Sequence, residues 1–166
     1  RAWVWMAALA LAACSAVPVR PPVQEAVLDN GLRVLVKEDR RAPVVVTQVW
    51  YKVGGSDEPD GLTGISHVLE HMMFKGTTAH PTGEFSRIIA ANGGRENAFT
   101  GSDYTAYFQT LEKSRLPIAF ELEADRMQHL TLDEKEFAKE IKVVMEERRL
   151  RTDDQPEGLA YERFLN

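Results

Sequence analysis

The stretch His67-Val68-Leu69-Glu70-His71 decides how the rest of the chain is interpreted. On an α-helix, His67 and His71 project to the same side, and Glu70 projects there too. Val68 and Leu69 point elsewhere and can anchor the helix in a core. Two neutral imidazoles can bind zinc, and a carboxylate beside the metal can accept a proton from metal-bound water. The run therefore predicts a zinc site with a general base on one helix.

The residues around this run predict the helix itself. Gly61 and Gly64 interrupt the preceding strand, and Thr63 is the expected N-cap. Lys75-Gly76 is the expected stop, with a cation in the last turn and a glycine just beyond it. Apolar residues occur at helical spacing: Ile65, Val68, Leu69, Met72 and Met73.

A third metal ligand is expected, because a catalytic zinc usually has three protein ligands and an open position for water. The predicted helix from Asp133 to Arg151 is rich in glutamate. Glu140 and Glu147 are seven residues apart, so they lie on nearly the same side of that helix. Both flank a stripe that is expected to be buried: Phe137, Ile141, Val144, Met145 and Arg148. Spacing alone leaves Glu140 and Glu147 as equal candidates.

The segment Gly61–Thr77, GLTGISHVLEHMMFKGT, resembles the zinc helix of the pitrilysin/insulysin family, which includes the mitochondrial processing peptidase and many bacterial peptidases. Its His-x-x-Glu-His order is the inverted form of His-Glu-x-x-His. The resemblance runs from about Ala26 to Asn166. In this family a glutamate seven residues after another glutamate is the zinc ligand, which implies Glu147. The resemblance also implies that Glu140 orients a liganding histidine.

The resemblance implies a zinc endopeptidase with one zinc ion per chain, held by His67, His71 and Glu147. The metal would lower the pKa of its bound water and stabilise the tetrahedral oxyanion. Glu70 would accept the proton of that water and deliver it to the leaving amine. Two alternatives are a non-catalytic scaffold or binding half of the same family and a metal-binding module without hydrolysis. The presence of every motif residue favours catalysis.

A β-hairpin is predicted where Arg95–Thr100 and Tyr104–Thr110 flank a Gly-Ser-Asp turn. The run Asn97-Ala98-Phe99-Thr100 resembles the family's edge strand, which binds substrate by strand addition. Main-chain hydrogen bonds then give affinity with little demand on the peptide sequence. Asn97 and Ala98 are therefore candidate contacts for a peptide or unfolded polypeptide, and an ordinary hairpin with an exposed edge is the alternative.

The N-terminal residues predict an exported protein. An apolar stretch has about the length of a signal-peptide h-region and is too short to span a bilayer. Leu11-Ala12-Ala13-Cys14 resembles a bacterial lipobox, which predicts a signal peptide over residues 1–16 and a periplasmic lipoprotein anchored through Cys14. Cleavage after Ala16, giving a soluble periplasmic protein, and a truncated membrane anchor are the alternatives. Residues 17–25 form a proline-rich spacer, so a membrane is expected as a partner only through the lipid.

Length and composition are sufficient for one domain with a core. The chain has 166 residues, 44% of them hydrophobic, and a net charge of −5. It has no basic block, which argues against nucleic acid as a partner. Residues 26–166 are expected to form an N-terminal zinc peptidase domain, truncated at its C-terminus. A second homologous half or subunit is expected to close over the substrate.

The order of elements predicts the fold class. Further strands are expected near Ala26–Leu28, Arg33–Glu38 and Val44–Val53, and further helices near Thr82–Ala91, near Ser114–His129 and after Pro156. Hairpins interleaved with helices predict an α+β fold, a two-layer sandwich of a mainly antiparallel sheet with helices packed on one face. The family resemblance implies the same fold.

Overall fold

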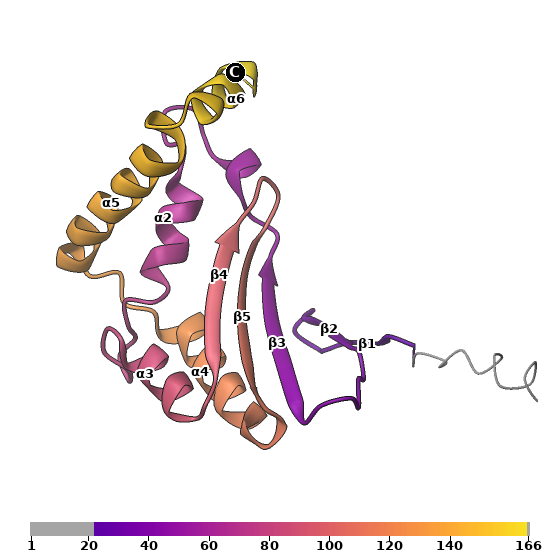
Figure 1. The fold of residues 1–166 in the computed structure, drawn as a ribbon. Coiled ribbons are helices and arrows are strands. Elements are labelled where there is room, and N and C mark those ends of the chain that lie inside the picture. Colours follow the sequence, from indigo (N-terminus) through magenta and orange to yellow (C-terminus); the bar gives the residue numbers. More distant parts are fainter. Residues whose placement is uncertain (1–21, 166) are drawn as a thin grey trace, which may run out of the picture. The chain divides into compact units, whose positions relative to one another are not determined.

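The computed structural model describes residues 22–165 of the chain (Figure 1). The predicted signal peptide with Cys14 and most of the predicted spacer lie outside the described residues. The chain divides into two compact units, Arg1–Ala42 and Pro43–Asn166. Within the described range, no helix combines the length and the apolar character that crossing a membrane requires.

The first unit contains a two-stranded antiparallel hairpin of β1 (Gln24–Val27) and β2 (Arg33–Val36). Asn30 stabilises the turn, since its side-chain oxygen accepts a hydrogen bond from a main-chain N–H two residues on, at 3.1 Å. Glu25 and Arg33 form an exposed ion pair across the strands. The sequence predicts this hairpin, although β1 begins two residues earlier than expected and β2 ends two residues earlier.

The second unit is built on a three-stranded antiparallel sheet in the order β3-β5-β4. The strands are β3 (Val44–Tyr51), β4 (Arg95–Thr100) and β5 (Thr105–Glu112). Thr100 lies opposite Thr105 at the tight end of the β4–β5 hairpin, which the sequence predicts. β4 is therefore the outer strand on one side of this sheet.

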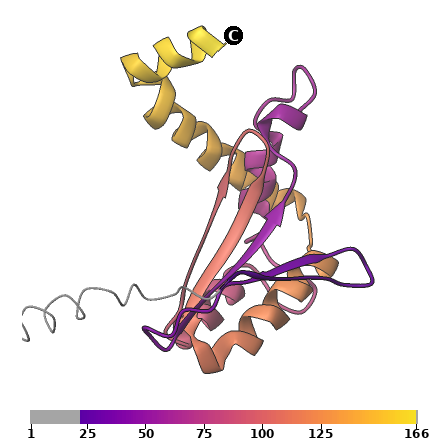
Figure 2. The same cartoon turned by 90° about the vertical axis from the view of Figure 1, so that its right-hand side faces the viewer.

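Three helices pack against one face of the sheet, namely α2 (Ile65–Met72), α3 (Glu84–Ala91) and α4 (Leu116–His129). α5 (Glu134–Arg148) packs on α2, and α6 (Pro156–Leu165) packs on the turn that follows α5. α3 and α4 lie beside the end where β4 begins, whereas α2 and α5 lie towards the end where it finishes (Figures 1 and 2). On the opposite face Val46 and Trp50 of β3 and Phe99 of β4 are exposed. This arrangement confirms the predicted α+β class.

The hydrophobic core lies between α3, α4 and β5, and its buried members are Phe85, Ile89, Leu111, Ala119 and Leu122. Arg126 and Glu123 form a buried ion pair. Glu123 also accepts a hydrogen bond from the side-chain amide of Gln109. The Arg126 guanidinium lies 4.4 Å from the ring centroid of Tyr107. A carboxylate and an aromatic face thus compensate the buried charge.

The start of α2 differs from the prediction. The N-cap is Gly64 and not Thr63, and its φ of 93° lies in the left-handed region that favours glycine. The main-chain N–H groups of Gly64 and Ser66 donate to the two carboxylate oxygens of Glu58, at 2.7 and 2.8 Å. A charged side chain from the preceding loop therefore satisfies the helix end and complements its dipole.

The buried side of α2 and its end also differ from the expectation. Val68 and Met72 are buried, but Leu69 and Ile65 are exposed. The helix ends at Met72, before the predicted stop at Lys75-Gly76. Only part of the apolar pattern therefore faces the core.

The predicted buried stripe of α5 is wrong. Phe137 and Met145 are 46% and 65% exposed, and Arg148 is exposed as well. The residue that α5 buries is Glu140. The prediction fails because α5 packs against α2 with carboxylates and not with an apolar surface. A π-helical turn, Arg149–Asp153, follows the helix.

Replacing Glu58 with alanine is expected to lower the free energy of unfolding by about 0.5–2 kcal/mol at pH 7, the usual cost of losing a helix cap. Burial raises the pKa of Glu58, but hydrogen bonds from Gly64 and Ser66 and the charge of His67 outweigh it and leave the pKa lowered. A lowered folded-state pKa contributes stability above the unfolded-state pKa, and this contribution is lost as the pH falls through the folded-state pKa.

The stability difference between wild type and Glu58→Ala should therefore shrink on acidification. Urea unfolding at a series of pH values from neutral to acidic measures it. A difference that stays constant over this range would show that the Glu58 charge does not stabilise α2.

Candidate metal centre

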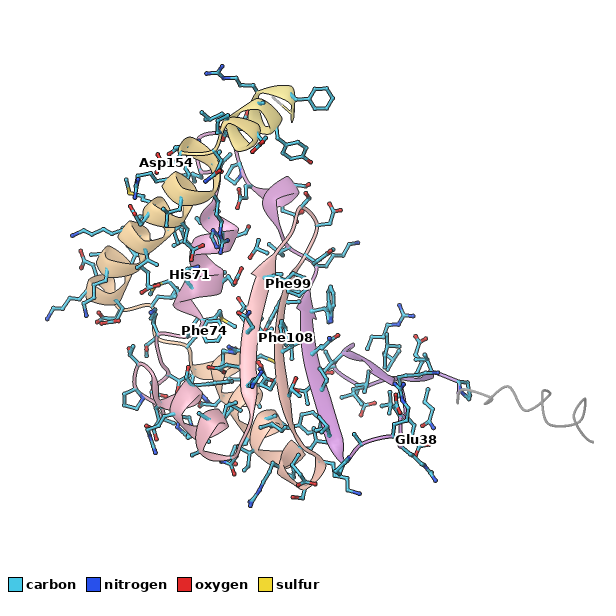
Figure 3. All side chains as sticks on the ribbon, viewed as in Figure 1. Glu38, His71, Phe74, Phe99, Phe108 and Asp154 are labelled. Atoms are coloured by element: carbon cyan, nitrogen blue, oxygen red, sulfur yellow. The ribbon has the colours of Figure 1, made fainter. Side chains whose placement is uncertain are left out.

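Three side chains from two helices converge in one pocket. The candidate ligand atoms of His67 and His71 on α2 and of Glu147 on α5 all lie within 4.8 Å of one another. The two Nε2 atoms lie 3.6 and 3.8 Å from the Glu147 carboxylate oxygens. Figure 3 shows His71 on α2, which runs between α5 and β4. The structure thus brings together the three residues that the sequence predicts as a metal site.

This donor set fits zinc. Two imidazole nitrogens and one carboxylate oxygen are zinc ligands, and catalytic zinc sites have three protein ligands plus an open position. The side chains of His67, His71 and Glu147 are 31%, 17% and 28% exposed, so a small ligand can reach them. Within residues 22–165 this is the one group of His, Cys, Asp or Glu side chains with the spacing of a metal site.

Glu140 lies behind His71, on the side away from Glu147. Its carboxylate is bonded to His71 Nδ1 at 3.1 Å and to Lys75 Nζ at 2.6 Å. Burial raises the pKa of Glu140, but the hydrogen bonds from Lys75 and His71 outweigh it, so the net pKa is lowered and the group is a carboxylate. A bond on Nδ1 leaves Nε2 turned towards Glu147, which is how a liganding histidine is oriented. The geometry therefore distinguishes the two glutamates: Glu147 faces the Nε2 atoms as a candidate ligand, and Glu140 contacts Nδ1 of His71.

Glu70 is on the same helix but reaches towards the sheet. It is 8% exposed, and its Oε2 accepts a hydrogen bond of 2.6 Å from the hydroxyl of Thr100, the last residue of β4. Glu70 lines the same pocket as His67 and His71. Within residues 22–165 no other hydrogen bond reaches its carboxylate, so the second oxygen is available for proton transfer.

β4 borders this pocket, which has a volume of about 760 Å³ and is lined by α2, α5 and residues 97–101. Asn97 and Ala98 therefore lie beside the candidate metal site. The main-chain N–H of Ala98 donates to the side-chain oxygen of Asn97 at 2.9 Å, in an exposed hydrogen bond. The predicted peptide-binding strand and the predicted metal ligands thus share one pocket.

The loop before α2 is tied to the β4–β5 turn. The N–H groups of Gly55 and Ser56 donate to the carbonyl oxygens of Gly101 and Ser102, at 3.0 and 2.7 Å. A Cβ atom at Gly54 would lie 2.4 Å from the Gly101 oxygen, so only glycine permits this approach. These contacts fix the entry to α2 against the end of β4.

Three contacts of the site were missed by sequence reasoning. Lys75 binds Glu140 and Arg151 lies 3.3 Å from Glu147. Arg151 follows Glu147 by four residues, so helical spacing offered a signal for that pair. The contact between Lys75 and Glu140 joins two distant segments of the chain and had no local signal. The contact between Thr100 and Glu70 had no local signal, since 30 residues separate its partners.

Comparison with known proteins identifies relatives named as zinc proteases. The chain is 43% identical over 147 residues to the zinc protease PqqE of Helicobacter pylori, covering 88% of this chain and 33% of that protein. It is 35% identical over 133 residues to the uncharacterized zinc protease YmxG of Bacillus subtilis, covering 80% and 32%. It is 34% identical over 127 residues to human mitochondrial cytochrome b-c1 complex subunit 1, covering 76% and 26%.

The fold is shared with a solved structure of a protease from Helicobacter pylori. The match has a TM-score of 0.82 at 41% sequence identity and covers 86% of this chain and 34% of that one. The chain thus spans about a third of the length of these relatives. The sequence pattern of the insulinase family matches residues 33–164, a range that includes the candidate metal ligands, Glu70, Glu140 and the candidate peptide contacts Asn97 and Ala98. This chain belongs to the insulinase family, peptidase family M16.

Proposed function

We propose that this chain is the metal-binding part of a zinc-dependent endopeptidase. The observation that carries the proposal is the convergence of His67, His71 and Glu147 in one pocket with Glu70. Such a pocket contains both a metal site with an open side and a carboxylate placed for proton transfer. Relatives named zinc proteases support the same reading.

His67, His71 and Glu147 would hold the zinc ion, and Glu140 would keep His71 turned towards it through Nδ1. Zinc in this position supplies Lewis acidity, which activates water and polarises a carbonyl group. Proton transfer and peptide binding are carried out by side chains and main-chain groups of the protein.

Glu70 acts as the general base and then as the general acid. Its oxygen that is not bonded to Thr100 takes a proton from the attacking water. The same carboxyl group returns that proton to the nitrogen of the leaving peptide, so that Glu70 is ionised again for the next cycle. β4 binds the peptide by strand addition along Asn97 and Ala98, which presents main-chain carbonyl groups to the pocket.

A non-catalytic scaffold or binding half of the same family is the alternative. One relative is named as a subunit of the cytochrome b-c1 complex and not as a protease, so family membership alone does not distinguish the two. Glu70 favours catalysis, because a site that only binds metal or protein has no need of a carboxylate beside the ligands.

We also propose that a second homologous half or subunit completes the enzyme and that its substrates are peptides or unfolded polypeptides. Strand addition supports this substrate class, because it demands little of the peptide sequence. Export to the periplasm as a lipoprotein through Cys14 stays a prediction from the N-terminal sequence.

Replacing Glu70 with glutamine in the full-length protein should lower kcat by about 10²–10⁴-fold, because the amide cannot accept the proton. Zinc should remain bound, since the proposed ligands are unchanged. Peptide hydrolysis and metal content measure the two effects. Glu146→Gln is the matched control, because it changes an exposed glutamate of α5 outside the pocket. Wild-type turnover in zinc-loaded Glu70→Gln would exclude Glu70 as the base.

Glu140→Ala should weaken zinc binding by about 10- to 100-fold, the usual cost of losing a residue that orients a ligand. Glu147→Ala removes a ligand and should weaken binding more. Competition with a fluorescent zinc chelator measures both affinities, with Glu136→Ala on the same helix as the control. A larger loss for Glu140→Ala than for Glu147→Ala would reverse the assignment of the two glutamates.

A further inference from the structure

We propose that Thr100 is a positioning residue that holds the Glu70 carboxylate in its reactive orientation. The inference rests on the proposed function of Glu70 as the base. Its starting observation is the hydrogen bond of 2.6 Å from the Thr100 hydroxyl to Glu70 Oε2. A hydrogen bond to an ionised carboxylate is among the stronger hydrogen bonds in proteins, and this one is partly buried.

The donor is held on a rigid element. Thr100 pairs with Thr105 across the β4–β5 ladder, and a β-branched side chain on a strand has few rotamers. The Thr105 hydroxyl is bonded to the main-chain oxygen of Val53 at 3.0 Å, so it does not compete for Glu70. The position of the Thr100 hydroxyl is therefore set by the sheet and not by the site.

The acceptor needs such a restraint. A glutamate side chain rotates about three bonds, and the pocket that Glu70 lines is open to water. Without the Thr100 hydroxyl, the Glu70 carboxylate can rotate away from the position of the attacking water. A general base must lie within hydrogen-bond reach of the proton it takes, and a shift of about 1 Å can cost about 100-fold in rate.

The same strand also carries the proposed peptide-binding residues. Ala98 and Thr100 are two residues apart on β4, so both side chains point to one side of the strand, which is the less exposed side. Thr100 therefore ties the base to the element that receives the peptide. The distance between the bound main chain and Glu70 is then fixed by the geometry of one strand.

The test uses three threonine variants of the full-length protein. Thr100→Val keeps the shape and removes the hydroxyl, whereas Thr100→Ser keeps the hydroxyl. Thr110→Val on β5 is the matched control, because Thr110 lies on the same sheet and does not line the pocket. Thr100→Ala removes the same hydroxyl and replaces the valine variant if that variant does not fold.

Thr100→Val should lower kcat by about 10- to 100-fold, with KM and zinc content changed by less than about twofold. Thr100→Ser should restore most of kcat, and Thr110→Val should leave it unchanged. The proposal is overturned by wild-type kcat in Thr100→Val, by an equal loss in Thr100→Ser, or by a change confined to KM.

A second readout does not depend on activity. In zinc-free protein labelled with ¹³C at the glutamate carboxyl groups, the Glu70 resonance is identified by its loss in Glu70→Gln. It should shift in Thr100→Val and not in Thr110→Val. An unshifted resonance overturns the proposed contact. An inactive wild-type protein would refute the proposed function, whereas the resonance would still decide whether Thr100 holds Glu70.

Discussion

The packing of α2 against α5 is the interaction on which the rest of the site depends. Helices usually pack through apolar ridges, but here the facing side chains are His67 and His71 on one helix and Glu140 and Glu147 on the other. Polar groups removed from water require hydrogen-bonding partners, and here the imidazoles of α2 and the carboxylates of α5 are partners for each other. This complementarity gives the candidate metal site its shape, and it leaves apolar residues of α5 such as Met145 exposed.

The carboxylates around α2 follow one rule, since each is held by a group from another element. Glu58 binds the N–H groups at the helix start, Glu70 is held by Thr100 of β4, and Glu140 is shared by His71 and Lys75. Each contact removes freedom from a side chain that would otherwise rotate in a pocket open to water. Local stability and the proposed function therefore draw on the same charged hydrogen bonds.

The features of the fold that the sequence predicts correctly are those set by residues close together in the chain. The β4–β5 hairpin, the start of α5 just after Asp133 and the spacing of His67 and His71 all follow from residues near each other in the chain. The predicted N-cap of α2, Thr63, is wrong because the N–H groups at the start of the helix donate to Glu58, which lies in the preceding loop. The buried pair of Glu123 and Arg126 had no signal, since charge on a helix normally indicates a solvated face.

X-ray diffraction at the zinc absorption edge, on crystals of the full-length protein, shows whether α2 and α5 bind a zinc ion between them. One anomalous peak is expected at about 2.0–2.2 Å from Nε2 of His67, Nε2 of His71 and an oxygen of Glu147. Glu140 should still be bonded to Nδ1 of His71. A zinc ion bound through Glu140 in place of Glu147, or no zinc between α2 and α5, would exclude the proposed metal centre.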